Sequence, residues 1–161
     1  MMRVLRMKPI TFSCEEILSL TPGDIARQIL DVSKWPEFKG YAFLPGIKNA
    51  VFEVQTPGIV GSRIRVTNTD GSSHVQEIVE WNPDQRLTLL MKDFSPPLSR
   101  LATCFEETWE FNRLDHATKV TRSFKLYARS SLTRLALAPI SWFLKRAIAS
   151  HLRQMRKAAA R

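Results

Sequence analysis

The spacing of hydrophobic positions at the start of the chain predicts a strand followed by two short helices. Apolar and polar side chains alternate from Ile10 onward, which predicts a β-strand that ends near Leu20. Thr21 can then cap a helix, because Pro22 suits a first helical position and an acidic residue follows within the first turn. A second short helical segment is predicted at residues 33–38.

The middle of the chain predicts a series of antiparallel strands. Alternation of apolar side chains places six of them, at residues 47–55, 59–68, 74–81, 86–91, 104–113 and 118–128. Asp70-Gly71 is the strongest hairpin signal, since a type I′ turn has positive φ at both central residues. Residues 93–101 contain Pro96-Pro97 and cannot form a ladder.

The C-terminal region predicts one long amphipathic helix, from about Ser131 to Lys157. Its apolar residues recur at three- and four-residue steps and are Leu132, Leu135, Ala136, Ile140, Phe143, Leu144, Ala147, Ile148 and Leu152. Pro139 lies inside this helix and is expected to kink it, because proline removes one hydrogen bond and clashes with the preceding turn.

Together these elements predict an α+β fold in a single domain, residues 1–161, with its core at about 10–157. A single amphipathic helix cannot bury its apolar stripe alone, and an antiparallel sheet with one apolar face is its natural partner. We therefore expect a curved antiparallel sheet of about seven strands around the long C-terminal helix, with two short helices after the first strand.

Six short stretches follow one another in an order that is typical of one known superfamily. They are Asp31-x-x-x-Trp35-Pro36-Glu37 within the helix pair 22–38, Gly61-Ser62-Arg63, Asn68-x-Asp70-Gly71, Glu77-x-Val79-Glu80-Trp81-Asn82-Pro83, Glu107-x-Trp109-x-Phe111 and Ala117-Thr118-Lys119-Val120-Thr121. Together they resemble the START-like superfamily, in particular its polyketide cyclase/dehydrase-like (SRPBCC) branch. The resemblance covers about residues 10–157 and implies a helix-grip fold with a cavity between sheet and helix.

The resemblance implies that this cavity binds or carries an apolar small molecule that is lipid-, quinone- or polyketide-like. An enzyme of the cyclase, aromatase or dehydratase type is the alternative, because one fold can carry either function. No G-x-S-x-G, HExxH, P-loop or GxGxxG motif occurs, and the three histidines are scattered along the chain. The residues therefore identify no catalytic centre, and we predict no cofactor and no metal site.

Candidates for the cavity wall come from the inward parity of the strands and from the apolar stripe of the helix. The apolar candidates are Phe12, Ile64, Leu89, Trp109, Phe111, Phe124, Ile140 and Phe143. Such residues are more often ordinary core than ligand contacts, because a sequence does not show where atoms are missing.

Three charged residues, Glu77, Glu107 and Arg122, share strand faces with apolar side chains and are cavity candidates too. Pairing the last hairpin across its turn places Trp109 opposite Arg122 and allows a cross-strand Glu107–Arg122 ion pair. Such charges can form structural ion pairs, can move to the outer face through a bulge, or can hold the polar head of an apolar ligand. In an enzyme, Glu107 or Glu77 would be the general base and Arg122 would stabilise an enolate.

Positive charge is concentrated in the last part of the chain. The sequence holds 24 Lys and Arg against 15 Asp and Glu, which gives a net charge of +9. Residues 116–161 contain eleven of the basic residues and no acidic residue, so the rest of the chain is slightly acidic. This asymmetry indicates an acidic partner surface.

At about 100° per residue, basic side chains of the C-terminal helix fall in one arc opposite its apolar stripe, with Trp142 in the middle. The basic members of the arc are Arg134, Lys145, Arg146, Arg153, Arg156 and Lys157. The arc can be a solvated face, a docking face for an anionic membrane with Trp at the interface, or a contact with the ribosome or nucleic acid.

The chain contains no run of about 18 apolar residues, and its N-terminal region lacks a signal-peptide core. We therefore expect a cytoplasmic protein, with peripheral membrane association if the basic arc binds lipid. The sequence leaves the oligomeric state open.

Overall fold

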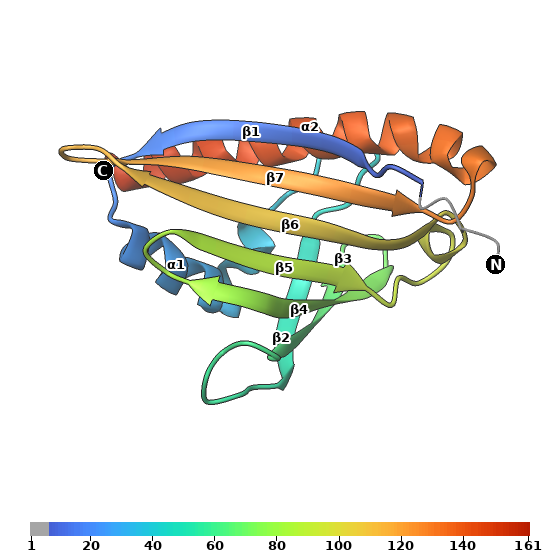
Figure 1. Cartoon of the computed structure of the whole chain (residues 1–161), viewed down its shortest axis with the longest axis horizontal. Helices are drawn as coiled ribbons and strands as arrows, with labels where there is room; N and C mark the ends of the chain where they lie inside the picture. The colour runs from blue at the N-terminus through green and yellow to red at the C-terminus, as the bar shows by residue number, and fades with distance from the viewer. Residues whose placement is uncertain (1–6) are drawn as a thin grey trace, which may run out of the picture.

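A computed structural model describes residues 7–161, so the first six residues of the predicted domain lie outside the described part. The fold is one seven-stranded antiparallel sheet with a long helix across one face (Figure 1). The elements are β1 (Ile10–Leu18), α1 (Pro22–Leu30), the 3-10 helix η1 (Val32–Glu37), β2 (Ile47–Val54), β3 (Arg63–Asn68), β4 (Ser73–Asn82), β5 (Arg86–Lys92), the 3-10 helix η2 (Leu98–Arg100), β6 (Ala102–Arg113), β7 (Thr118–Ala128) and α2 (Ser131–Ala159).

The strand order is β1-β7-β6-β5-β4-β3-β2, and every neighbouring pair is antiparallel. Each strand from β2 to β7 pairs with its sequence neighbour, whereas β1 crosses over to pair with β7. In Figure 1, β1, β7 and β6 run side by side, and β2 and β3 cross them steeply at the other end of the sheet. The sheet is therefore curved, and the predicted helix-grip fold is confirmed.

Local sequence signals explain where the helices begin. The side chain of Thr21 accepts a hydrogen bond from the backbone N–H of Asp24 at 3.1 Å, which is the predicted cap of α1. At α2, Ser130 and Thr133 form a reciprocal capping box. The helix then continues through Pro139 to Ala159.

Two turns differ from the sequence prediction. The strand predicted at residues 59–68 begins only at Arg63, and residues 59–62 form a turn before it. The turn forms because Ile59 and Gly61 have positive φ values of 72° and 90°, which a strand does not allow. A hairpin turn forms at Asp70-Gly71, but only Gly71 has positive φ, so the turn is not type I′. The Asp70 carboxylate instead accepts the backbone N–H of Ser72 at 2.9 Å.

The core lies between the concave face of the sheet and one side of α2. The side of the helix that faces the sheet buries Leu137, Leu144, Ile148 and Leu152. The sequence prediction also placed Leu132 and Leu135 on this stripe, which is wrong, since they are 77% and 72% exposed. Steps of three and four residues generate two stripes on this helix, and only tertiary packing decides which one is buried. Within residues 7–161, no helix is long and apolar enough to cross a membrane.

Candidate functional site

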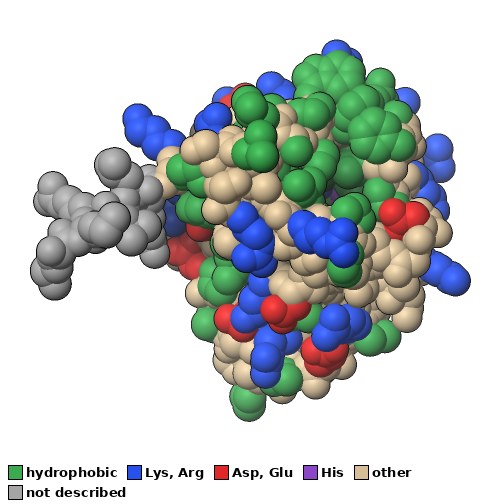
Figure 2. Space-filling view, turned by 90° about the vertical axis from the view of Figure 1, so that its right-hand side faces the viewer, with side chains coloured by type: hydrophobic (Ala, Val, Ile, Leu, Met, Phe, Trp, Pro, Cys, Tyr) green, Lys and Arg blue, Asp and Glu red, His purple; other side chains and the backbone are tan. Residues whose placement is uncertain are grey.

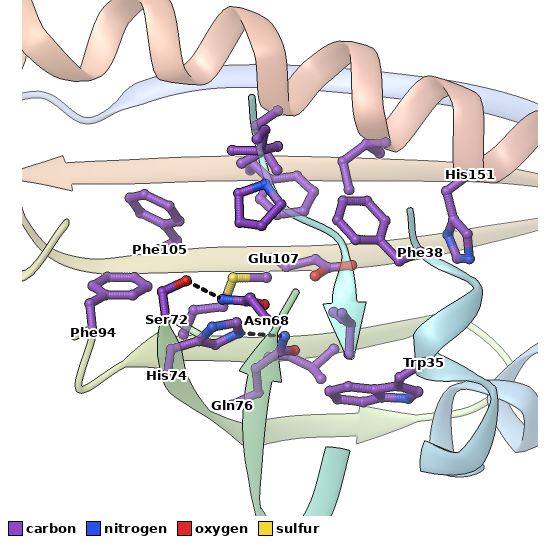
Figure 3. Close-up of a pocket in the computed structure, with 18 of the residues that line it drawn as sticks. Trp35, Phe38, Asn68, Ser72, His74, Gln76, Phe94, Phe105, Glu107 and His151 are labelled. Carbon is purple, nitrogen blue, oxygen red and sulfur yellow. Dashed lines mark hydrogen bonds between the residues drawn. The ribbon is translucent and has the colours of Figure 1, made fainter. Parts of the chain in front are cut away.

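A pocket of about 360 Å³ lies between the curved half of the sheet, α2, η1 and the loops around Phe43 and Phe94 (Figure 3). This volume falls within the range of roughly 300–1,000 Å³ that is usual for small-molecule sites. Most of the wall is aromatic or aliphatic; Trp35, Phe38, Phe94, Phe105, Leu144 and Ile148 are examples. Two hydrogen-bonded groups of polar side chains interrupt this apolar wall, and the exposed residues Lys34, Glu37 and Asp70 also line the pocket.

The first polar group is a buried ion pair on β6 and β7. Alternation along β6 turns Phe105, Glu107 and Trp109 toward the pocket, and the register places Arg122 opposite Trp109. The predicted register is therefore confirmed. Arg122 donates from Nε at 3.0 Å and from Nη2 at 2.6 Å to the same oxygen, Oε1 of Glu107. Both side chains are more than nine-tenths buried.

Stacking and a third residue hold the guanidinium of Arg122 in place. Its central carbon lies 4.1 Å from the ring centroid of Trp109, which is a cation–π contact. Its Nη1 lies 3.0 Å from Nδ1 of His151, which projects from α2. Because a guanidinium can only donate, Nδ1 of His151 accepts this hydrogen bond and Nε2 carries the ring proton.

Burial keeps His151 neutral. Removal from water, and secondly the nearby positive charge of Arg122, lower the pKa of His151 from 6.5 to about 3. In Figure 3, His151 extends from α2 toward the space that Glu107 reaches from β6. This part of the pocket wall therefore holds one charge pair that is neutral overall and one uncharged imidazole.

The second polar group lies on β3 and β4. His74 Nε2 lies 3.1 Å from the amide nitrogen of Gln76, so Nε2 accepts and Nδ1 carries the proton. Asn68 donates to the hydroxyl of Ser72 at 3.0 Å in the same part of the pocket (Figure 3). Desolvation, and secondly the charge of Arg65, lower the pKa of His74 to about 4, so this imidazole is also uncharged near neutral pH.

The structure brings only part of the predicted cavity residues together. Those that line the pocket are Leu89, Glu107, Trp109, Arg122, Phe124 and Ile140. Phe12 stacks on Phe124 with centroids 5.0 Å apart; it is partly buried and packs against the core outside the pocket. Ile64 is fully buried core, and Phe111 packs against that core beyond the pocket. Phe143 contacts Phe43 on the outer side of the pocket rim, with centroids 4.3 Å apart.

Glu77 lies outside the pocket, contrary to the parity prediction. A β-bulge interrupts β4 between Ile78 and Glu80, so the strand does not keep one parity from end to end. Glu77 accepts a hydrogen bond from Nζ of Lys92 at 2.9 Å, and both side chains are partly exposed. The residue of β4 that faces the pocket at this level is Gln76.

The structure places the predicted basic arc on the exposed side of α2. All of its members are exposed, and they are Arg134, Trp142, Lys145, Arg146, Arg153, Arg156 and Lys157. Arg156 donates to Glu16 on β1 at 2.9 Å, which ties the end of α2 to the sheet edge. The arc faces away from the pocket wall, so the two features are distinct surfaces of the same helix.

The sequence prediction did not identify the two pocket histidines. A signal existed for His151, which lies seven residues after Leu144 and three after Ile148 and so shares their face of α2. For His74 and Gln76, the bulge in β4 reversed the face that a simple alternation assigns to them. The aromatic wall of Trp35, Phe38 and Phe94 comes from η1 and loops, where no periodicity applies.

The sheet, the long helix and the pocket between them form a helix-grip fold with an internal cavity. No protein-family model matches the sequence, and no curated protein sequence matches it. Solved structures do match the fold. The protein TTHA0849 from Thermus thermophilus is 12% identical, with a TM-score of 0.69 over 94% of this chain and 97% of that one.

Two further solved structures share the fold. A START superfamily protein from Mycobacterium smegmatis is 10% identical, with a TM-score of 0.61 over 90% of this chain and 98% of that one. The di-domain ARO/CYC protein StfQ from the steffimycin biosynthetic pathway is 16% identical, with a TM-score of 0.68 over 95% of this chain. This chain spans about half of StfQ, 52% of its length. The predicted resemblance in fold is thus confirmed.

Proposed function

We propose that the protein binds a mostly apolar small molecule that carries one uncharged polar group. The observation that carries this proposal is the buried Glu107–Arg122–His151 network in the wall of an otherwise aromatic and aliphatic pocket. Protein interiors are normally filled to high density, so a pocket of about 360 Å³ between sheet and helix favours an occupant. A few fixed polar groups in an apolar wall orient such a ligand.

The charge balance around the buried Glu107–Arg122 pair favours an uncharged polar group. Arg122 is neutralised by Glu107, and both pocket imidazoles are uncharged near neutral pH. A ligand carboxylate would lie beside the carboxylate of Glu107, and like charges in a buried site are costly. A hydroxyl group avoids this repulsion.

Two atoms are available to hold a hydroxyl group. Both hydrogen bonds from Arg122 go to Oε1 of Glu107, and no fully buried side-chain oxygen in residues 7–161 lacks a partner. Oε2 of Glu107 is therefore accessible from the pocket and can accept a hydroxyl proton. Nε2 of His151 carries a proton and can donate to the hydroxyl oxygen.

A matched pair of probes tests this function after native mass spectrometry and organic extraction of the purified protein. We expect 1-dodecanol to bind at least about tenfold more tightly than dodecanoate near neutral pH. The fluorescence of the pocket tryptophans, Trp35 and Trp109, reports the binding of each probe. Extraction should also yield an apolar compound with a hydroxyl or carbonyl group. Failure of both probes to bind, or equal affinity for the two, would contradict the proposal.

Variants of the Glu107–Arg122 ion pair test whether this pair causes the preference for 1-dodecanol over dodecanoate. Glu107→Gln leaves the guanidinium of Arg122 without its counter-charge, so dodecanoate should gain at least about tenfold in affinity over wild type. Glu80→Gln is the matched control. Glu80 forms an ion pair with Arg86 at a distance of 2.8 Å, and neither residue lines the pocket. This control should keep the wild-type preference for 1-dodecanol.

An enzyme of the cyclase, aromatase or dehydratase type is the second candidate. A carboxylate and two uncharged imidazoles border the same pocket, and such groups can exchange protons with a bound carbonyl compound. The similarity of fold to an ARO/CYC protein supports this candidate. Two results together would establish the enzyme: the wild type converts a poly-β-ketone thioester, and His151→Gln loses this conversion but still binds 1-dodecanol. If the wild type converts no thioester, binding remains the only function of the pocket.

A further inference from the structure

The first half of α2 exposes a second apolar stripe on the side opposite the core. At about 100° per residue, Leu132, Leu135, Pro139 and Trp142 lie roughly half a turn from the buried Leu137. Leu132, Leu135 and Trp142 are 77%, 72% and 50% exposed. Large apolar side chains gathered on a solvent face mark a contact surface.

A loop beside α2 extends this stripe. Phe43 is 68% exposed and lies with its ring centroid 4.3 Å from that of Phe143, while Tyr41 lies 6.5 Å from Trp142. The loop conformation depends on Gly40, which has a φ of 76° and leaves no room for a Cβ against the backbone of residues 44–45. We call the side chains of Leu132, Leu135, Tyr41, Phe43, Trp142 and Phe143 the apolar patch.

The apolar patch borders the pocket. Phe43 belongs both to the patch and to the pocket wall, and Ile140, which follows Pro139 on α2, also lines the pocket. Figure 2 views the end of the molecule at which α2 begins, and it shows hydrophobic side chains gathered at its upper edge with Lys and Arg side chains beside them. A surface bound to the patch would therefore lie next to the pocket.

Basic side chains flank the apolar patch. Arg146 stacks over Trp142, 4.6 Å from the ring centroid, one turn along the exposed stripe. In the described part of the chain, the ion pairs leave Lys145, Arg146 and Arg153 without an acidic partner. Along this stripe, α2 thus changes from apolar side chains, up to Trp142, to the cationic Arg146 and Arg153.

We propose that this face binds the surface of an anionic phospholipid bilayer. Exposed Leu and Phe side chains can insert at the acyl boundary, Trp and Tyr are favoured at the interface, and unpaired Lys and Arg attract anionic headgroups. Nucleic acid fits less well, because its phosphates attract the cations but do not bury the apolar patch. A second copy fits less well too, because a two-fold contact would bring the same unpaired cations together.

The inference rests on the proposed function in one respect, since it places the mouth of a ligand site at the bilayer, where apolar molecules accumulate. The docking itself requires no ligand. Vesicle binding and 1-dodecanol binding therefore fail independently, and either proposal can be contradicted while the other stands.

Co-sedimentation of the full chain with vesicles tests the docking. We expect binding to phosphatidylcholine vesicles that contain phosphatidylglycerol, at least about tenfold weaker binding to phosphatidylcholine alone, and loss of binding as salt increases. The variant Lys145→Glu/Arg146→Glu should bind the anionic vesicles at least about thirtyfold more weakly. The variant Leu132→Ser/Leu135→Ser should bind about tenfold more weakly, because less apolar surface enters the bilayer.

Control variants carry the same changes on the far strands. Arg63→Glu reverses an exposed charge at the start of β3, and Val79→Ser removes an exposed apolar side chain of β4. Both should bind vesicles like the wild type, and all variants should bind 1-dodecanol like the wild type, which shows that they are folded. No vesicle binding, or binding that Leu132→Ser/Leu135→Ser leaves unchanged, overturns the proposal. A dimer that dissociates in this variant, or RNA bound in place of vesicles, also overturns it.

Discussion

Replacing Glu107 with leucine is expected to lower the free energy of unfolding by about 3–5 kcal/mol, because it leaves a buried guanidinium without its counter-charge. Arg122 is 6% exposed and packs against Trp109, so water cannot replace the lost carboxylate. Replacing Arg122 with methionine should cost a similar amount, since the carboxylate of Glu107 is then the uncompensated charge.

The double variant Glu107→Leu/Arg122→Met should recover much of this loss. Two apolar side chains of similar volume suit an apolar wall, so removing both charges costs less than removing either one. We expect a coupling energy of about 2–3 kcal/mol between the two positions. Urea denaturation of the wild type and the three variants measures it.

A second ion pair on β7 is the matched control for this cycle. Nζ of Lys119 lies 3.4 Å from Oε2 of Glu15 on β1, and both side chains are well exposed. Exposed pairs contribute little, so the same cycle at these positions should give less than about 1 kcal/mol of coupling. If the two losses at Glu107 and Arg122 simply add, the buried pair does not act as one unit and cannot set the charge selectivity that we propose.

The fold could be predicted from the sequence because each element carries its own local signal. The cap at Thr21, the alternation along β6 and β7 and the helical period of α2 each act over a few residues. The register of the β6–β7 hairpin follows from its short turn, and it led directly to the Glu107–Arg122 pair. The order of the elements and the residues in the turns were enough to predict the fold and this register.

The pocket could be predicted only in part, because its wall depends on long-range packing. The bulge at Ile78 and Glu80 moves Glu77 outward and Gln76 inward, and nothing in the local sequence marks it. The same limit applies to α2, where Leu135 and Leu144 follow equally good helical steps but only Leu144 is buried. On a helix with two apolar stripes, only packing against the sheet shows which stripe is buried. The other stripe stays exposed and is available for a partner.

Lowering the pH from about 7.5 to about 5 is expected to reduce the free energy of unfolding by up to about 4 kcal/mol, about 2 from each pocket histidine. In the unfolded chain an imidazole takes up a proton as the pH falls below 6.5. In the folded protein, burial lowers the pKa of His74 to about 4 and that of His151 to about 3. Between these values the unfolded state binds more protons, so stability is complete above pH 6.5 and decreases as the pH falls.

Urea denaturation at several pH values above about 5 isolates this effect from the titration of carboxyls with lowered pKa values. Those carboxyls are Asp24, Asp70 and Glu80. Their usual pKa values are 3.8 for Asp and 4.5 for Glu, and the lowered values fall below the pH range of the experiment. His74→Gln and His151→Gln should each remove about half of the pH dependence, since glutamine cannot become charged. At position 151 the glutamine oxygen can still accept the hydrogen bond from Arg122, so a loss of pH dependence there reports protonation rather than a lost contact. Stability that does not change between about pH 7 and 5 would show that both imidazoles accept protons in the folded state, and the pocket would then present positive charge to its ligand.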